Sequence, residues 1–157
     1  MITGQFPRRE WKTNPGDRIR TLEEALTLAK GHGIVIPDEV EIYIDDAGEL
    51  HRDFLACGPR VDKSPGQRVY WSDLIHPLTN RIPFRIWPGI LSSDEAIIAV
   101  IAHEMHELLS LQPWLEGGGV SVDDLILHTE PRRRGNLHDE AWDVADLYVD
   151  RMRGIKR

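Results

Sequence analysis

Four side chains that can bind a metal ion or transfer a proton stand close together in the sequence: His103, Glu104, His106 and Glu107. They belong to residues 92–111, a stretch without Gly or Pro that opens on two serines suited to cap a helix. On a helix, His103 shares a face with both His106 and Glu107, about one turn further along. Two donors at this spacing can hold the same metal ion, and imidazole and carboxylate are both zinc ligands.

Glu104 follows the first histidine directly and points about 100° away from it on a helix. It therefore misses a metal ion held by His103, but it can reach a water molecule on that ion. The His-Glu-x-x-His motif works in this way, with two imidazoles on zinc and the Glu as general base. Here Glu107 occupies the position of the second histidine, and His106 lies one residue earlier. The sequence leaves both residues as candidates for the second ligand.

A third ligand is expected from a helix predicted at residues 137–153, with Asn136 as its N-cap. His138 lies on the apolar face of that helix, together with Trp142 and several small residues. The helix at 92–111 also carries small residues beside His103, so two such faces can pack closely. We interpret His138 as the third ligand. The alternatives are Glu140 and His128, and helical periodicity turns Glu140 away from the packing face.

The run Ile-Ala-His-Glu-Met-His-Glu-Leu-Leu at residues 101–109 resembles the active-site helix of zincin-like metallopeptidases. Small zincin-like domains occur as toxins in bacterial polymorphic toxin systems, and this chain resembles those domains more than a large secreted protease. The resemblance covers residues 82–111, with a weaker echo at 136–153. It implies a zinc-dependent metallopeptidase, and for a toxin it also implies a cognate inhibitor protein as a partner.

The resemblance also implies a ligand set. About one zinc ion per chain would be held by His103, by Glu107 or His106, and by His138, with one coordination position open. Glu104 would deprotonate the water molecule at that position.

A strand is predicted at residues 81–87 because polar and apolar residues alternate there. Pro83 cannot donate a hydrogen bond to a neighbouring strand, which favours the edge of a sheet. In zincin-like peptidases the strand beside the active-site helix pairs with extended substrate. The resemblance therefore implies that a peptide or protein substrate binds along residues 82–87.

The remaining pattern predicts an α+β fold. Thr21 and Glu24 form a capping box that starts a helix at residue 22. Alternating residues at 40–44 and 49–56, around an Asp-Asp-Ala-Gly turn, predict a β-hairpin, and 67–71 reads as a further strand. The predicted order is an N-terminal helix, a small, mostly antiparallel sheet of about four strands, the motif helix, which Pro113 should end, and C-terminal helices.

We expect one domain at residues 21–157, preceded by an irregular arm at 1–20, since 157 residues with 41% hydrophobic content suit a single soluble domain. The lone Cys57 excludes an intrachain disulfide and a cysteine zinc site. No stretch resembles a membrane span or a signal peptide, so we expect a cytoplasmic protein, or one delivered by a specialised secretion route.

Two other functions compete with the peptidase. The first is a metal-dependent nuclease acting as a toxin, for which the basic run at 132–134 is the only support. The formal net charge of −7 opposes nucleic-acid binding. The second is a non-enzymatic binding domain in which the histidine and glutamate side chains form a structural site.

Overall fold

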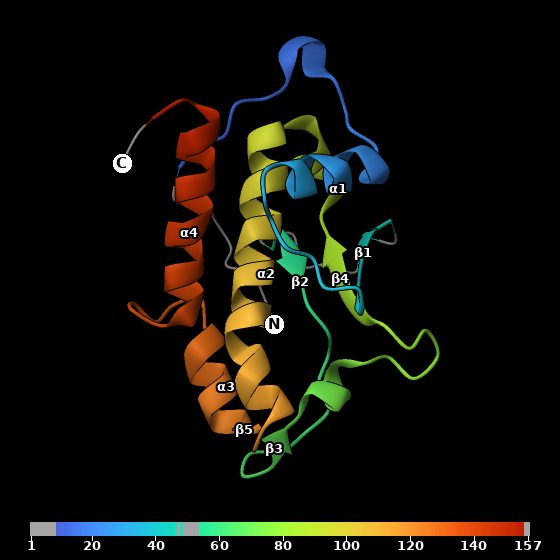
Figure 1. The fold of residues 1–157 in the computed structure, drawn as a ribbon, viewed down its shortest axis with the longest axis vertical. Helices are drawn as coiled ribbons and strands as arrows, with labels where there is room; N and C mark the ends of the chain where they lie inside the picture. The colour runs from blue at the N-terminus through green and yellow to red at the C-terminus, as the bar shows by residue number, and fades with distance from the viewer. Residues whose placement is uncertain (1–8, 47, 49–53, 156–157) are drawn as a thin grey trace.

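The computed structural model describes residues 9–46, 48 and 54–155 (Figure 1). The fold is α+β, as predicted. No helix among the described residues is long and apolar enough to cross a membrane. The helical elements are η1 (Pro15–Asp17), α1 (Leu22–Gly31), η2 (Trp71–Leu74), η3 (Pro88–Ser92), α2 (Asp94–Glu116), α3 (Val122–Thr129) and α4 (Leu137–Met152), where η denotes a 3-10 helix. The strands are β1 (Val40–Ile44), β2 (Ala56–Cys57), β3 (Arg68–Val69), β4 (Ile82–Ile86) and β5 (Val120–Ser121).

The long helix α2 runs through the centre of the molecule (Figure 1). It lies between α4 on one side and the main sheet on the other, and α1 packs near its first turns. Phe84 from β4 and Ile98 from α2 belong to the same buried core. On the opposite face of α2, Ala99 and His103 are also fully buried. Both faces of α2 therefore carry internal residues, and the polar side chains of His103, Glu104 and Glu107 lie inside the protein.

The main sheet has three strands in the order β1-β4-β2. β1 pairs with β4 in parallel, from Val40 opposite Ile82 to Ile44 opposite Ile86. β2 pairs with β4 in the antiparallel direction, but only at Ile86 and Arg85. The interpretation of residues 82–87 as an edge strand is therefore wrong, because β4 is the central strand.

Pro83 is tolerated in this central strand for a local reason. The N–H of Ile82 donates to Glu39 and the carbonyl of Ile86 accepts from Asp45, so the even-numbered residues of β4 pair toward β1. The odd-numbered residues face the other side, where β2 pairs only with the last residues of β4. The missing N–H of Pro83 therefore costs no ladder bond with β2.

The predicted hairpin of residues 40–44 and 49–56 does not form as a strand pair, because β1 and β2 lie on opposite sides of β4. Part of that segment, residues 47 and 49–53, lies outside the described residues. The strand predicted at 67–71 is present as β3, but it pairs with β5 in a separate two-stranded ladder. Parallel β1–β4 pairing also makes the main sheet less antiparallel than expected.

The helix boundaries largely agree with the sequence pattern. The Thr21–Glu24 capping box is formed, and Ser93 and Asn136 cap α2 and α4 through their side chains. Pro113 does not end α2, which continues to Glu116 and stops at Gly117. A proline so near the C-terminus removes one helical hydrogen bond without ending the helix.

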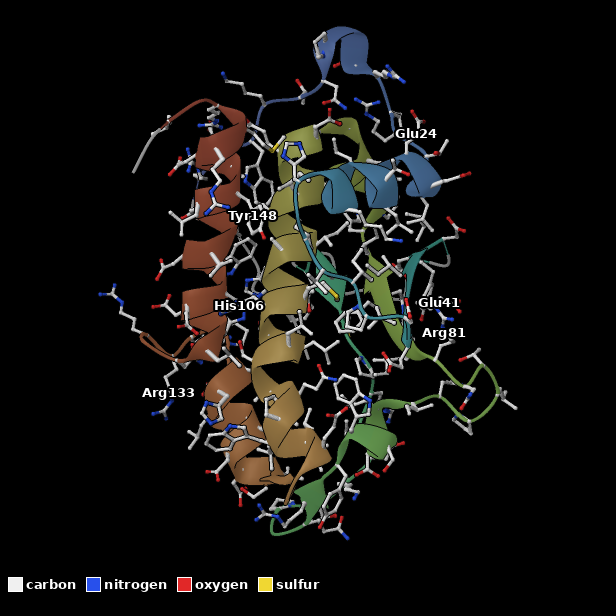
Figure 2. All side chains as sticks on the ribbon, viewed as in Figure 1. Glu24, Glu41, Arg81, His106, Arg133 and Tyr148 are labelled. Carbon is white, nitrogen blue, oxygen red and sulfur yellow. The ribbon has the colours of Figure 1, made fainter. Side chains whose placement is uncertain are left out.

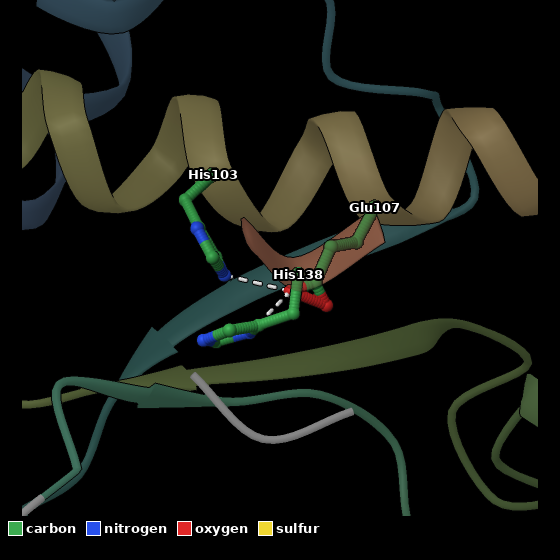
Figure 3. A group of neighbouring side chains, drawn as sticks. All are labelled: His103, Glu107 and His138. Carbon is green, nitrogen blue, oxygen red and sulfur yellow. Dashed lines mark hydrogen bonds and ion pairs between the residues drawn. The ribbon is translucent and has the colours of Figure 1, made fainter. Parts of the chain in front are cut away.

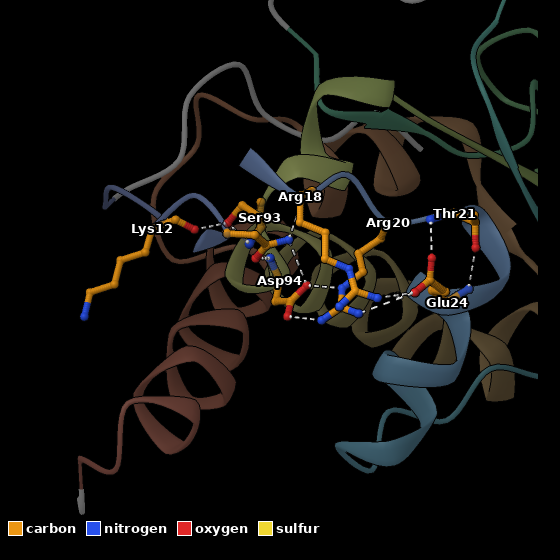
Figure 4. Close-up of polar contacts among 9 residues, drawn as sticks. Lys12, Arg18, Arg20, Thr21, Glu24, Ser93 and Asp94 are labelled. Carbon is orange, nitrogen blue, oxygen red and sulfur yellow. Dashed lines mark hydrogen bonds and ion pairs between the residues drawn. The ribbon is translucent and has the colours of Figure 1, made fainter. Parts of the chain in front are cut away.

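Residues 9–20 form an arm that is fastened to the start of α2 (Figure 4). The hydroxyl of Ser93 donates to the carbonyl of Lys12 at 2.6 Å. The side chain of Asn14 accepts from the N–H of Asp94, and the guanidinium of Arg20 donates two hydrogen bonds to the Asp94 carboxylate, each at 2.9 Å. These contacts bring the arm to the end of α2 that lies beside the last turn of α4.

Candidate metal centre

Three of the residues expected to bind metal come together in the interior: His103, Glu107 and His138 (Figure 3). Oε1 of Glu107 lies 2.6 Å from Nε2 of His103 and 3.1 Å from Nδ1 of His138. One ligand atom from each residue lies within 4.8 Å of the other two. The side chains are almost inaccessible to solvent, with exposed fractions of 0%, 0% and 4%. We refer to these three residues as the His–Glu–His cluster.

Two helices position the cluster. His103 and Glu107 are one turn apart on α2, so they face the same direction. His138 lies in the first turn of α4, on the face that packs against α2. Small residues allow this close packing: Ala99 on α2 and Ala141 on α4 are fully buried. The spacing of residues within α2 and the packing of α4 together generate the site.

The donors of the cluster fit a zinc ion. Zinc prefers imidazole nitrogen and carboxylate oxygen at about 2.0–2.2 Å, usually with four ligands. Both ring nitrogens of His103 lack a hydrogen bond within the described part of the chain. The 2.6 Å contact of Nε2 with Glu107 is short but does not have hydrogen-bond geometry. A buried imidazole in this state is costly, and a bound cation would satisfy it.

His106 is not brought into the cluster. Its ring lies at the protein surface between α2 and α4, with Nε2 3.2 Å from Oε2 of Glu140 (Figure 2). The alternative third ligands also lie outside the cluster. Glu140 makes the surface contact with His106. The ring of His128 packs edge-on against Trp114, with centroids 6.2 Å apart. Of the alternatives left open by the sequence, the geometry brings together Glu107 and His138. Ligation itself remains a prediction.

Glu104 is buried on another side of α2, with 2% of its surface exposed. Neither of its carboxylate oxygens accepts a hydrogen bond from the described residues. Burial raises the pKa of this carboxyl group well above its ordinary value, and the negative charge of Glu107 raises it further. Both effects favour the protonated form of Glu104 over its charged form.

In the His–Glu–His cluster, the pKa values of His103 and Glu107 are shifted in the opposite direction to that of Glu104. Burial lowers the pKa of His103, although Glu107 opposes this effect, so the imidazole is neutral. Burial by itself raises the pKa of Glu107, but the neighbouring nitrogens of His103 and His138 outweigh burial, and the pKa is lower than usual. A neutral imidazole and an ionised carboxylate are the forms that bind metal ions.

Two residues near the site were given no role by the sequence. Trp142 lies on the same face of α4 as His138, and its ring centroid is 4.3 Å from that of His103. Its helical spacing from His138 was the available signal. Cys57 on β2 is within electrostatic reach of Glu104, whose charge adds to burial in raising the pKa of the thiol. The proximity of Cys57 to Glu104 depends on the tertiary arrangement of β2 and α2, so the sequence carries no signal for it.

A groove of about 560 Å³ begins at Cys57. One wall is formed by residues 57–61, which continue from the edge strand β2, and the other by residues 125–131 of α3 and the following loop. Leu125, Ile126 and Val61 contribute apolar surface to it. The groove therefore runs between the segment that follows β2 and the segment that leads to His138.

Comparisons with protein-family models, with curated proteins and with solved structures find no match to this chain. The chemistry of the site therefore rests on its own residues and their geometry.

Proposed function

We propose that the protein is a zinc-dependent hydrolase, and most specifically a metallopeptidase of zincin type. The observation that carries the proposal is the convergence of His103, Glu107 and His138 beside a buried glutamate that has no hydrogen-bond partner among the described residues. Two imidazole nitrogens and one carboxylate leave a fourth zinc position for water or substrate. The resemblance of residues 101–109 to zincin active-site helices agrees with these roles.

A zinc ion in this position supplies Lewis acidity, which lowers the pKa of a bound water and polarises a substrate carbonyl. His103, Glu107 and His138 would hold the ion. A cation there also favours the ionised form of Glu104 and so counteracts the effect of burial. Glu104 would then accept a proton from the attacking water and deliver it to the leaving nitrogen when the C–N bond breaks.

The substrate strand is assigned differently from the sequence prediction, since β4 is internal. Among the described strands, β2 is the outer one on the side of Glu104, and its continuation lines the groove that faces α3. An extended peptide can add to a free strand edge through main-chain hydrogen bonds. We therefore propose that a peptide substrate lies in the groove between residues 57–61 and α3.

The test begins with metal content. Purified wild type, His103→Ala and His106→Ala are compared by elemental mass spectrometry after loading with zinc and desalting. We expect about one zinc ion per chain in the wild type and in His106→Ala, and loss of zinc in His103→Ala. Absence of zinc from all three proteins would overturn the proposal.

Hydrolysis is then assayed with unfolded protein substrates and a peptide library. Glu104→Gln should retain zinc and reduce turnover by at least about 100-fold, the contribution typical of a general base. Wild-type turnover in Glu104→Gln would remove Glu104 from the mechanism. If the wild type binds zinc but hydrolyses no substrate, the metal site stands and the proposed peptidase activity is rejected.

A closed structural site is the second candidate, and the burial of all three side chains favours it. Cobalt substitution separates the two candidates because an open position accepts an added anion. A change in the cobalt absorption spectrum on adding azide supports the hydrolase, whereas an unchanged spectrum supports the structural site.

A further inference from the structure

Trp142 contacts both histidines of the cluster. Its ring centroid lies 4.3 Å from His103 at an interplanar angle of 41°, and 6.4 Å from His138 at 88°. The two imidazoles are themselves edge to face, with centroids 4.6 Å apart. Trp142 is 4% exposed and lies one turn after His138 on α4. It therefore fills the space between the two helices next to the point where the ligand atoms converge.

The orientation of His103 depends on such packing. A metal-binding histidine is usually held by a hydrogen bond from its second ring nitrogen to a carboxylate, carbonyl or water. Neither nitrogen of His103 has a hydrogen-bond partner among the described residues. Besides the 2.6 Å contact of Nε2 with Glu107, two aromatic rings pack against this imidazole: the indole of Trp142 and the imidazole of His138.

The N-terminal arm also contacts Trp142. The ring of Trp11 packs on Trp142, with centroids 6.2 Å apart at 33°. Trp11 is held between two anchored neighbours: the N–H of Lys12 donates to Glu95 at 2.8 Å, and the carbonyl of Glu10 accepts from Arg153 at 3.0 Å. An aromatic series therefore leads from the arm through Trp142 to His103.

We propose that Trp142 is a positioning residue for the metal site, and that Trp11 acts through it. The ring of Trp142 keeps the imidazole of His103 directed at the ion, and the arm keeps Trp142 in place. This inference rests on the metal-binding part of the proposed function and is independent of hydrolysis. It makes residues 9–20 part of the site although none of them contributes a ligand.

The test compares Trp142→Leu, Trp142→Phe and Trp11→Leu with the wild type. Zinc affinity is measured by competition with a chromophoric chelator, and thermal stability is measured on the same metal-free proteins. Losing an outer-shell partner weakens metal binding about 10–100-fold, so we expect at least about a tenfold loss in Trp142→Leu. Phe restores a flat ring and should keep the affinity within a few-fold of wild type. Trp11→Leu should show a smaller loss.

Val149→Ala is the matched control, because Val149 is fully buried on the same helix. It should lower the melting temperature and leave zinc affinity unchanged. Equal zinc affinity in Trp142→Leu and wild type overturns the positioning role. If Trp142→Leu fails to fold, Trp11→Leu decides, and unchanged affinity there rejects the role of the arm.

A second readout needs no metal. In the metal-free protein, the ring current of Trp142 should displace the ring-proton resonances of His103 in histidine-labelled NMR spectra. Trp142→Leu should move these resonances toward ordinary values and broaden them as the ring samples several orientations. Sharp, unmoved resonances reject the inference. A wild type that binds no zinc rejects the metal site itself, and the inference with it.

Discussion

Glu107 on α2 and His138 on α4 form a buried contact of 3.1 Å between Oε1 and Nδ1. The same oxygen lies 2.6 Å from His103, so one carboxylate faces two imidazoles. We predict that Glu107→Gln lowers zinc affinity by at least about 100-fold, because the amide keeps the shape of the side chain but not its charge. Isothermal titration with zinc measures this change.

His106→Ala serves as the control for Glu107→Gln. The side chain of His106 is 28% exposed, and its Nε2 lies 3.2 Å from the surface residue Glu140. Its removal should change zinc affinity by less than about threefold and stability by less than about 0.5 kcal/mol. A loss of zinc binding in His106→Ala would mean that the second ligand is His106 after all.

Glu104 makes stability depend on pH. Its pKa in the folded chain is raised by burial and by Glu107, so the folded state binds this proton more tightly than the unfolded state. The wild type should therefore lose stability as pH rises from the ordinary pKa of about 4.3 toward the folded pKa. Glu104→Gln has no proton to lose, so metal-free Glu104→Gln should exceed the wild type in stability at pH 8, by about 1–3 kcal/mol.

Denaturant unfolding of both proteins between pH 4 and pH 8 tests this prediction. The comparison reports on residue 104 together with its coupling to Glu107, since the two proteins share every other titrating group. The stability difference should shrink toward zero at pH 4. A difference that stays constant over the whole range would show that Glu104 does not titrate differently on folding.

Zinc should stabilise the protein by mass action. A ligand present at 100 times its dissociation constant stabilises the folded state by about 2.7 kcal/mol, which corresponds to roughly 5–10 °C in melting temperature for a chain of this size. Scanning calorimetry with zinc and with a chelator measures the shift. The shift should disappear in His103→Ala, and an equal shift in that variant would indicate zinc binding elsewhere.

A side chain at Gly119 should destabilise the protein. Its φ is +79°, and a Cβ would lie 2.8 Å from the ring of Tyr70 and 3.0 Å from the carbonyl oxygen of Val69. We predict that Gly119→Ala destabilises the protein by about 1–3 kcal/mol through left-handed backbone strain and this contact. Gly118→Ala is the matched control, because a Cβ there meets nothing within 4 Å. Equal unfolding midpoints for the two variants would contradict the prediction.

The local part of the fold could be predicted from the sequence. The capping residues Thr21, Ser93 and Asn136 act on the backbone of their own first turn, so their effect is visible in a few residues. The apolar face of α4 was equally clear, and His138, Trp142 and Val149 are buried as that face requires. Such signals depend on helical periodicity alone.

The strand order could not be predicted in this way. β1 and β2 flank a turn-like sequence, which favoured a hairpin, yet β4 lies between them. Which strands pair depends on packing against α2, and no short segment carries that information. Pro83 correctly indicated that one side of β4 forms no ladder bond at this position. It wrongly suggested that β4 as a whole is an edge strand.

The choice between His106 and Glu107 was open for a similar reason. Both lie on the face of α2 that carries His103, so the spacing alone allows either pair. The position of α4 decides which of them is buried: Glu107 meets His138, and His106 stays at the rim beside Glu140. A helical wheel of α2 contains no information about where α4 docks.

The residues of the His–Glu–His cluster come from two helices, and this affects how the native state can open locally. His103 and Glu107 stay together whenever α2 is intact, but His138 joins them only while α4 is docked. An ion bound to all three would have to lose a ligand before α4 could move away. Amide hydrogen exchange in α4 should therefore slow markedly when the ion is present, while the amides of α1, which contributes no ligand, should exchange as before.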